Sequence, residues 1–124
     1  MIGGIRRCVF AFLAQENDKS YILTNCLYED AGDQACYAEV VYMAEKRASL
    51  FVPVRLLIDQ EEHLQRVTNP IRRNRWKSID PKDVYYVTSL LSISHPNFLE
   101  LNVSRLSPED VAATIMNHIK LLQT

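Results

Sequence analysis

The chain has 124 residues, of which 48% are apolar and 23% charged, with 14 basic residues against 15 acidic ones. These proportions predict a soluble globular protein of one domain, because the length is too short for two ordinary domains. A net charge of −1 excludes an overall basic nucleic-acid-binding protein, so we expect no nucleic-acid partner. No apolar run approaches the roughly 18 residues that a membrane helix needs, so we expect no membrane insertion.

The spacing of the cysteines, histidines and glycines argues against several kinds of site. The three cysteines, at positions 8, 26 and 36, lack CxxC spacing and follow no secretory leader, which predicts packing thiols in a reducing cytoplasm. The histidines show neither HxxxH nor HExxH spacing, so we expect no metal site. All three glycines lie at or before position 32, and the sequence contains neither GxxxxGK[ST] nor GxGxxG.

The first part of the chain predicts a helix, a strand and a second helix. Helical spacing of apolar residues indicates a helix over residues 5–16. The expected inner face of this helix consists of Ile5, Val9, Phe12 and Leu13. The β-prone run 21–24 predicts a buried strand that Asn25 ends, and Asp33 is a suitable N-cap for a helix reaching residue 47.

Residues 50–58 carry the strongest strand signal, because their β-branched and aromatic content is typical of a strand that is covered on both faces. Pro53 must lie near the start of this strand or where its N–H would not be paired, since proline cannot donate to a ladder. Asp59 and Glu62 then have the spacing of a capping box, which predicts a helix that Asn69–Pro70 ends.

The last part of the chain begins with a polar, arginine-rich loop over residues 71–78. Asp80–Pro81 predicts a new helix, because proline suits the first helical position. The expected inner face of that helix consists of Val84, Val87, Leu90 and Leu91. A strand is expected over 98–103, and Ser107 with Pro108 gives a strong start signal for a terminal helix.

Strands that alternate with helices predict right-handed crossovers and a parallel sheet. We therefore expect an α/β layered domain over residues 1–124.

Three segments carry a resemblance to a known family: SYILTN at 20–25, LFVPVRLLID at 50–59 and HPNFLELNVS at 95–104. In this order, with NPIR at 69–72 and Lys77 between the last two, they resemble the small P-loop kinase-like ATP-binding proteins, relatives of gluconate, shikimate and chloramphenicol kinases. The resemblance implies a P-loop nucleoside/shikimate-kinase-like fold. It also implies ATP and Mg²⁺ as cofactors and a small-molecule phosphate acceptor.

The sequence departs from that family at its front. Family members begin with a strand and a GxxxxGK[ST] loop, and that strand lies in the middle of the sheet, between the strands that match 21–25 and 50–58. We therefore expect a kinase-like domain that lacks its first strand and is inactive as a phosphotransferase. It would be either a piece of a longer kinase or a chain whose remaining strands pair with each other or across a homodimer. The alternative is a non-catalytic dimeric remnant or interaction module that uses no cofactor.

The resemblance also assigns roles to individual residues. The lid-like residues that would contact phosphate and assist catalysis are Arg72, Arg73, Arg75 and Lys77, beside Trp76. The acceptor substrate would be bound by Asn25, Glu29 and Asp30, and the nucleotide by Arg66, Asn102 and Ser104, with Arg105 in the same loop. Each group also has a simpler interpretation. The arginine cluster would be a solvated charged loop, and Asn25 with Glu29 and Asp30 a polar strand end. Asn102, Ser104 and Arg105 would form a turn that leads into a helix cap. An anion or RNA-end binder that uses the arginine cluster alone is a further alternative.

Overall fold

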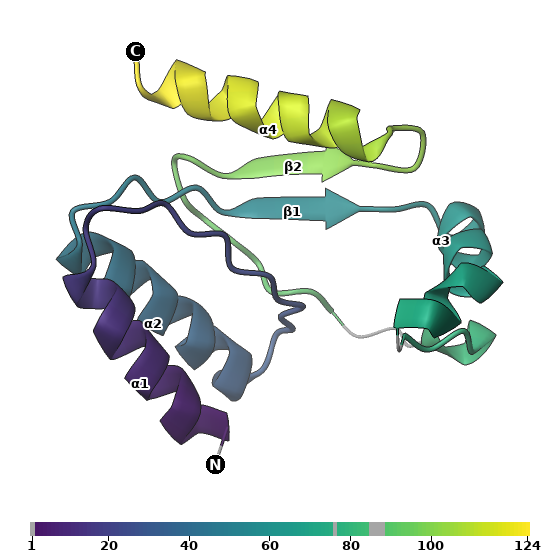
Figure 1. Ribbon diagram of the computed structural model, residues 1–124, viewed down its shortest axis with the longest axis horizontal. Coiled ribbons are helices and arrows are strands. Elements are labelled where there is room, and N and C mark those ends of the chain that lie inside the picture. The colour runs from purple at the N-terminus through teal and green to yellow at the C-terminus, as the bar shows by residue number, and fades with distance from the viewer. Residues whose placement is uncertain (1, 76, 85–88) are drawn as a thin grey trace. The chain divides into compact units, whose positions relative to one another are not determined.

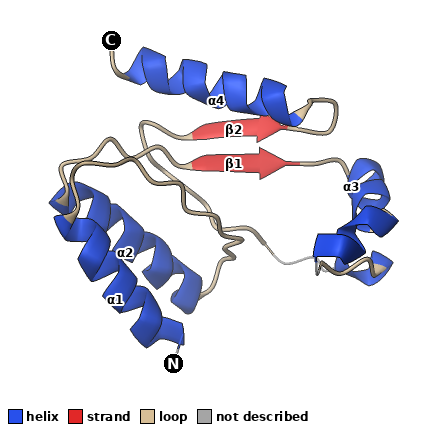
Figure 2. Ribbon diagram, in the orientation of Figure 1, coloured by secondary structure: helices blue, strands red, loops and turns tan. Residues whose placement is uncertain are grey.

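A computed structural model describes residues 2–75, 77–84 and 89–124 (Figure 1). The chain combines helices with a small parallel sheet (Figure 2), which confirms the α/β class at this coarse level. In chain order, with η for 3-10 helices, the elements are α1 (Ile2–Gln15), α2 (Ala31–Lys46), β1 (Val54–Leu57), α3 (Gln60–Val67), η1 (Pro70–Arg75), η2 (Pro81–Val84), β2 (Leu99–Asn102) and α4 (Pro108–Leu122).

The chain divides into two compact units, and each is described by itself. The first unit comprises Met1–Phe51 with Thr88–Ile93, and the second comprises Val52–Val87 with Ser94–Thr124. Helices α1 and α2 belong to the first unit, and the sheet with the remaining helices belongs to the second. In the part of the chain that the structure describes, no helix is long and apolar enough to span a bilayer.

The sheet of the second unit contains β1 and β2, which pair in parallel from Val54↔Leu99 to Leu57↔Asn102. Pro53 directly precedes β1, and its carbonyl oxygen accepts a hydrogen bond of 3.0 Å from the Leu99 amide. The proline therefore lies where its missing N–H costs no ladder bond, which confirms the expected position at the strand's start.

Helix α4 follows β2 closely, as predicted. The Ser107 hydroxyl accepts a hydrogen bond of 3.1 Å from the Asp110 amide, and Pro108 occupies the first helical position. Near the other end of α4, Nε2 of His118 lies 2.8 Å from the Asn97 carbonyl oxygen, in the loop before β2. The first contact caps the start of α4, and the second ties its last turns to the loop before β2.

In the first unit, α1 and α2 lie side by side and run in the same direction (Figure 1). Their shared core consists of Leu13, Val40 and Met43, with Phe10 and Ala14 packed against it. A parallel helix pair needs a long return, and the segment between the two helices supplies it in extended form.

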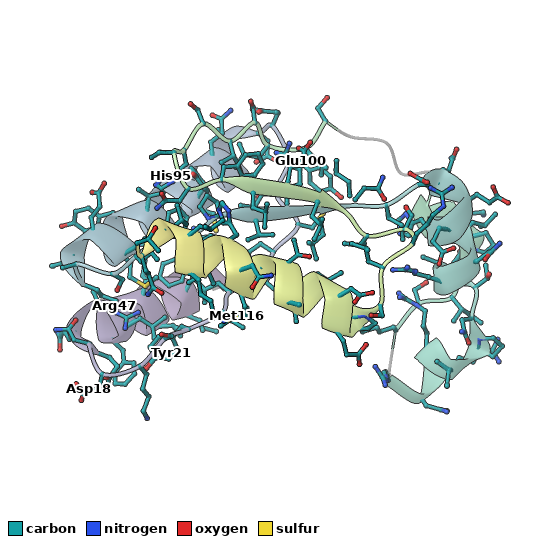
Figure 3. All side chains as sticks on the ribbon, turned by 90° about the horizontal axis from the view of Figure 1, so that it is seen from above. Asp18, Tyr21, Arg47, His95, Glu100 and Met116 are labelled. Atoms are coloured by element: carbon teal, nitrogen blue, oxygen red, sulfur yellow. The ribbon has the colours of Figure 1, made fainter. Side chains whose placement is uncertain are left out.

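The predicted strand over 21–24 is wrong. This segment belongs to the extended return and is not part of a ladder, and Ile22 is 92% exposed. Arg47 holds the return instead, because its Nη2 donates to the Lys19 carbonyl oxygen at 2.7 Å and its guanidinium carbon lies 5.0 Å from the centre of the Tyr21 ring (Figure 3). A strand needs an edge to pair with, and the nearest bridge lies further on, between Tyr28 and Leu90.

The predicted inner face of α1 is only partly correct. Leu13 is buried, but Ile5, Val9 and Phe12 are exposed. The apolar arc of α1 is wider than a single neighbouring helix can cover. Helix α2 covers the side that carries Leu13 and Phe10 and leaves the other side open.

The start of α2 also differs from the prediction. The N-cap is Asp30 rather than Asp33, because Oδ1 of Asp30 accepts a hydrogen bond of 2.8 Å from the Asp33 amide. The Asp33 carboxylate instead accepts a bond of 2.7 Å from the Tyr28 amide. Either of these two aspartates could cap a helix from its place in the sequence. Asp33 is not the cap, because its carboxylate is already bonded to the Tyr28 amide.

The arginine-rich segment and the helix predicted after it both differ from the prediction. Residues 70–75 form the 3-10 helix η1 instead of a loop, and the next helix is only η2. Positions 85–88 of the predicted helix lie outside the described residues. Its last residues are not helical, since the amide of Leu91 donates to the Leu27 carbonyl oxygen at 3.0 Å.

Candidate functional site

The carboxyl ends of β1 and β2 bring three polar residues together. The backbone amide of Asp59, just after β1, donates to Oγ of Ser104 at 2.7 Å. Nδ2 of Asn102, the last residue of β2, donates to Oδ1 of Asp59 at 3.0 Å, and its Oδ1 accepts from the Ser104 amide at 3.0 Å. The carboxyl edge of a parallel sheet is the usual ligand-binding edge of α/β proteins.

Arg66 reaches this edge from α3. Its Nε donates to Oε1 of Glu62 at 2.8 Å, and its Nη2 donates to the carbonyl oxygens of Val103 and Ser104 at 3.1 and 3.3 Å. The structure therefore places Arg66, Asn102 and Ser104 at one edge, where the sequence predicted nucleotide contacts. Whether they contact a nucleotide stays a prediction, because these bonds are within the protein.

The capping box predicted at the start of α3 is wrong. Asp59 occupies the N-cap position but makes no side-chain capping bond, because its carboxylate binds Asn102. Glu62 turns to Arg66 instead of the helix start. Asp59 was missed as a site residue, although its place directly after a strongly predicted strand was a signal for it.

A shallow recess of about 150 Å³ opens at this edge. Its lining residues are Asp59, Glu61, Glu62, Gln65, Ser104 and Arg105. This volume is below the roughly 300–1,000 Å³ of typical small-molecule pockets, so it has room for part of a nucleotide only. Carboxylates, an amide and a hydroxyl can bind the hydroxyl groups of a ribose or the amino group of a base. Three carboxylates facing one arginine do not suit a triphosphate.

The arginine segment follows α3 in the same unit. Nε of Arg72 donates to the Ser78 carbonyl oxygen at 3.0 Å, and the Lys77 amide donates to the Arg72 carbonyl oxygen at 3.1 Å. Arg73, Arg75 and Lys77 are exposed, whereas Trp76 lies outside the described residues. The segment thus presents cations that an anionic group in solution can reach.

The residues predicted to bind the acceptor substrate belong to the first unit. Asn25 is exposed in the extended return, and the strand that was to carry it is absent. The Glu29 carboxylate accepts hydrogen bonds from Nε2 of Gln34 and from the Ser92 amide, and Asp30 caps α2. Local structure therefore accounts for the positions of Glu29 and Asp30, and their contact with a substrate stays a prediction.

Two pKa shifts belong to the first unit. The hydrogen bond from Arg6 to Glu39, 2.9 Å long at Nε, raises the pKa of the arginine. Burial beside Phe51 raises the pKa of the Tyr37 phenol. Within residues 2–75, 77–84 and 89–124, no group of three or more His, Cys, Asp or Glu side chains is arranged to hold a metal ion.

The chain matches no protein-family model, no curated protein and no solved structure.

Proposed function

We propose that this chain is a kinase-like nucleotide-binding protein that holds a nucleotide at the carboxyl edge of β1 and β2. The base and ribose would occupy the acidic recess, and the phosphates would lie on the arginine segment. The chain would not transfer phosphoryl groups by itself, because its 124 residues contain no GxxxxGK[ST] loop to hold β- and γ-phosphates.

The observation that carries this proposal is the meeting of Asn102, Ser104 and Arg66 beside a recess at the carboxyl edge of a parallel strand pair. The hydrogen-bonding groups of the recess suit a base and a ribose, and the exposed cations Arg73 and Arg75 suit phosphate oxygens. The resemblance of segments 50–59 and 95–104 to ATP-binding kinases supports the same ligand.

Thermal unfolding with adenosine, ATP and tripolyphosphate, each with and without Mg²⁺, tests the proposal. At a ligand concentration ten times Kd, a ligand that binds only the native state adds about 1.4 kcal/mol, which corresponds to a Tm increase of about 5 °C. We expect adenosine and ATP to raise Tm, and ATP to do so at lower concentration.

Variants then separate the two parts of the site. The double variant Arg73→Ala/Arg75→Ala is expected to weaken ATP binding and to leave adenosine binding unchanged. Lys19→Ala, which removes an exposed cation of the other unit, is expected to change the binding of neither ligand. A Tm that does not respond to adenosine or ATP would contradict the proposal. Stabilisation by tripolyphosphate alone, with a steep salt dependence, would instead identify a simple anion binder.

The open edges of the strand pair favour a second candidate, a non-catalytic interaction module that dimerises. In the described part of the chain β1 and β2 form the only ladder, so each strand has a second edge with no strand beside it. A dimer in sedimentation equilibrium that does not respond to nucleotide would support this candidate, and a monomer would contradict it.

A further inference from the structure

The outer edge of β1 carries backbone groups that bind nothing in the described part of the chain. The carbonyl oxygens of Pro53 and Leu57 accept hydrogen bonds of 3.0 and 2.8 Å from amides of β2 and of the residue after it. Because alternate residues of a strand direct their backbone groups to opposite edges, those of Val54, Leu56 and Ile58 point away from β2. Among the described residues, no other backbone or side-chain group bonds to them.

The side chains along this outer edge are apolar. Leu56 is 52% exposed, and Val54 and Ile58 are half-buried on the same face of the strand. A charged side chain is one of the usual features that protect an open edge from pairing, and the outer edge of β2 has one in Glu100. The outer edge of β1 has none, so an extended strand is the ligand that it suits.

We propose that β1 pairs with β1 of a second copy, antiparallel, across a two-fold axis at Leu56. In this register Leu56 lies opposite Leu56 of the second copy, and Val54 lies opposite Ile58. Each of the three pairs exchanges two backbone hydrogen bonds, so every unpaired group of the edge gains a partner. A two-fold contact uses the same surface on both copies, so no further binding surface is needed.

The side chains suit this register. Leu56 lies beside Leu101 of β2, so the pairing creates a row of leucines across four strands, two from each copy. On the other face Arg55 lies opposite Leu57 of the second copy, while its own guanidinium stays 3.5 Å from the Glu100 carboxylate. Like charges therefore do not lie directly opposite one another.

The two neighbouring registers suit the edge less well. If Val54 lay opposite Leu56, Arg55 would lie opposite Arg55 of the second copy, and like charges in that position destabilise a sheet. If Leu56 lay opposite Ile58, Val54 would lie opposite Gln60, where α3 already begins, and its hydrogen bonds would be lost. The inference rests on the second candidate function and assigns that dimer one edge and one register.

Sedimentation equilibrium of the full chain tests the contact with two opposite charges at one position. Leu56→Lys and Leu56→Asp are each expected to raise the dimer dissociation constant roughly tenfold or more, because like charges then meet across the axis. An equimolar mixture of the two variants is expected to restore the dimer, because opposite charges meet instead. Mixing cannot repair a folding defect, and far-UV circular dichroism confirms that each variant keeps its helices.

A control variant makes the test specific. Leu121→Lys changes a leucine of α4 that is 71% exposed, and it is expected to leave the dimer intact. A dimer that neither Leu56 variant weakens, or that the mixture does not restore, would overturn the β1 contact and leave the second candidate function standing. A wild-type chain that is monomeric at about 100 μM would overturn both.

Discussion

Arg66 shows how a residue predicted to bind ligand can also hold the fold together. Its guanidinium joins Glu62 of α3 to two carbonyl oxygens at the end of β2. Five donors in a fixed fork allow one side chain to make these contacts at once. Arg66 is therefore better regarded as a positioning residue for the carboxyl edge than as a free phosphate ligand.

We expect Arg66→Ala to lower the free energy of unfolding by about 1–2 kcal/mol, since charge-assisted hydrogen bonds are lost at a half-exposed site. Arg66→Lys is expected to restore little of the loss, because an ammonium group cannot reproduce the fork. Urea unfolding measures both, with the exposed Arg75→Ala as the matched control, expected to change stability by less than about 0.5 kcal/mol. Equal effects of Arg66→Ala and Arg75→Ala would show that Arg66 does not hold this edge.

Tyr37 gives the first unit a predictable response to alkaline pH. Its ring centre lies 6.1 Å from that of Phe51, and burial raises the phenol pKa above its ordinary value of 10.0. The unfolded chain therefore loses this proton at lower pH than the folded chain. The stability that Tyr37 contributes is present in full below pH 10 and falls as the pH rises above it.

Urea unfolding at a series of pH values on either side of 10 measures this effect. Tyr37→Phe is expected to reduce the alkaline loss of stability, because the phenylalanine has no proton to lose. Tyr42→Phe, an exposed tyrosine on the same helix, is expected to keep the loss because Tyr37 remains. The same alkaline decline in Tyr37→Phe as in the wild type would contradict this account.

Among the elements, β2 and α4 could be predicted because their signals are local. The strand expected over 50–58 forms only as β1, Val54–Leu57, and it is not covered on both faces, since Leu56 is 52% exposed. Pro53 fixes where the first strand can start, and Ser107 with Pro108 fixes where the last helix begins. The run 21–24 could not be predicted correctly, because a strand depends on a neighbouring edge that the sequence does not show. The exposed side of α1 was missed for a related reason: periodicity shows an apolar face but not how much of it a neighbour covers.

The candidate site was predictable to a similar extent. Asn102 ends a well-predicted strand and Ser104 follows it, so the sequence already placed them at the carboxyl edge. Asp59 was assigned to a helix cap, because a capping-box pattern does not reveal a competing partner on another strand. The acceptor residues Asn25 and Glu29 depended on a strand that does not form.

The cap of α2 leads to a further prediction. Asp30→Ala is expected to cost about 1 kcal/mol of stability, because the Asp33 amide loses its acceptor. Asp30→Asn is expected to keep most of that stability, since an amide oxygen also caps well. Urea unfolding monitored by circular dichroism measures both. If Asp30→Ala and Asp30→Asn unfold at the same urea concentration as the wild type, the cap assignment is wrong.

At the scale of the whole molecule, the two units differ in what they carry. The second unit holds the parallel strand pair, the recess and the exposed cations. The first unit is built around the shared core of α1 and α2, which consists of Leu13, Val40 and Met43. Nucleotide binding therefore concerns the second unit, and substitutions of exposed residues in the first unit are expected to leave it unchanged.

An NMR titration of the ¹⁵N-labelled full chain with ATP tests the central claim most directly. The account predicts that the amide signals of Asp59, Asn102 and Ser104 shift together with those of Arg73 and Arg75, while the signals of α2 stay in place. Signals that do not move at millimolar ATP, or that move mainly in α1 and α2, would contradict a nucleotide site at the carboxyl edge of β1 and β2.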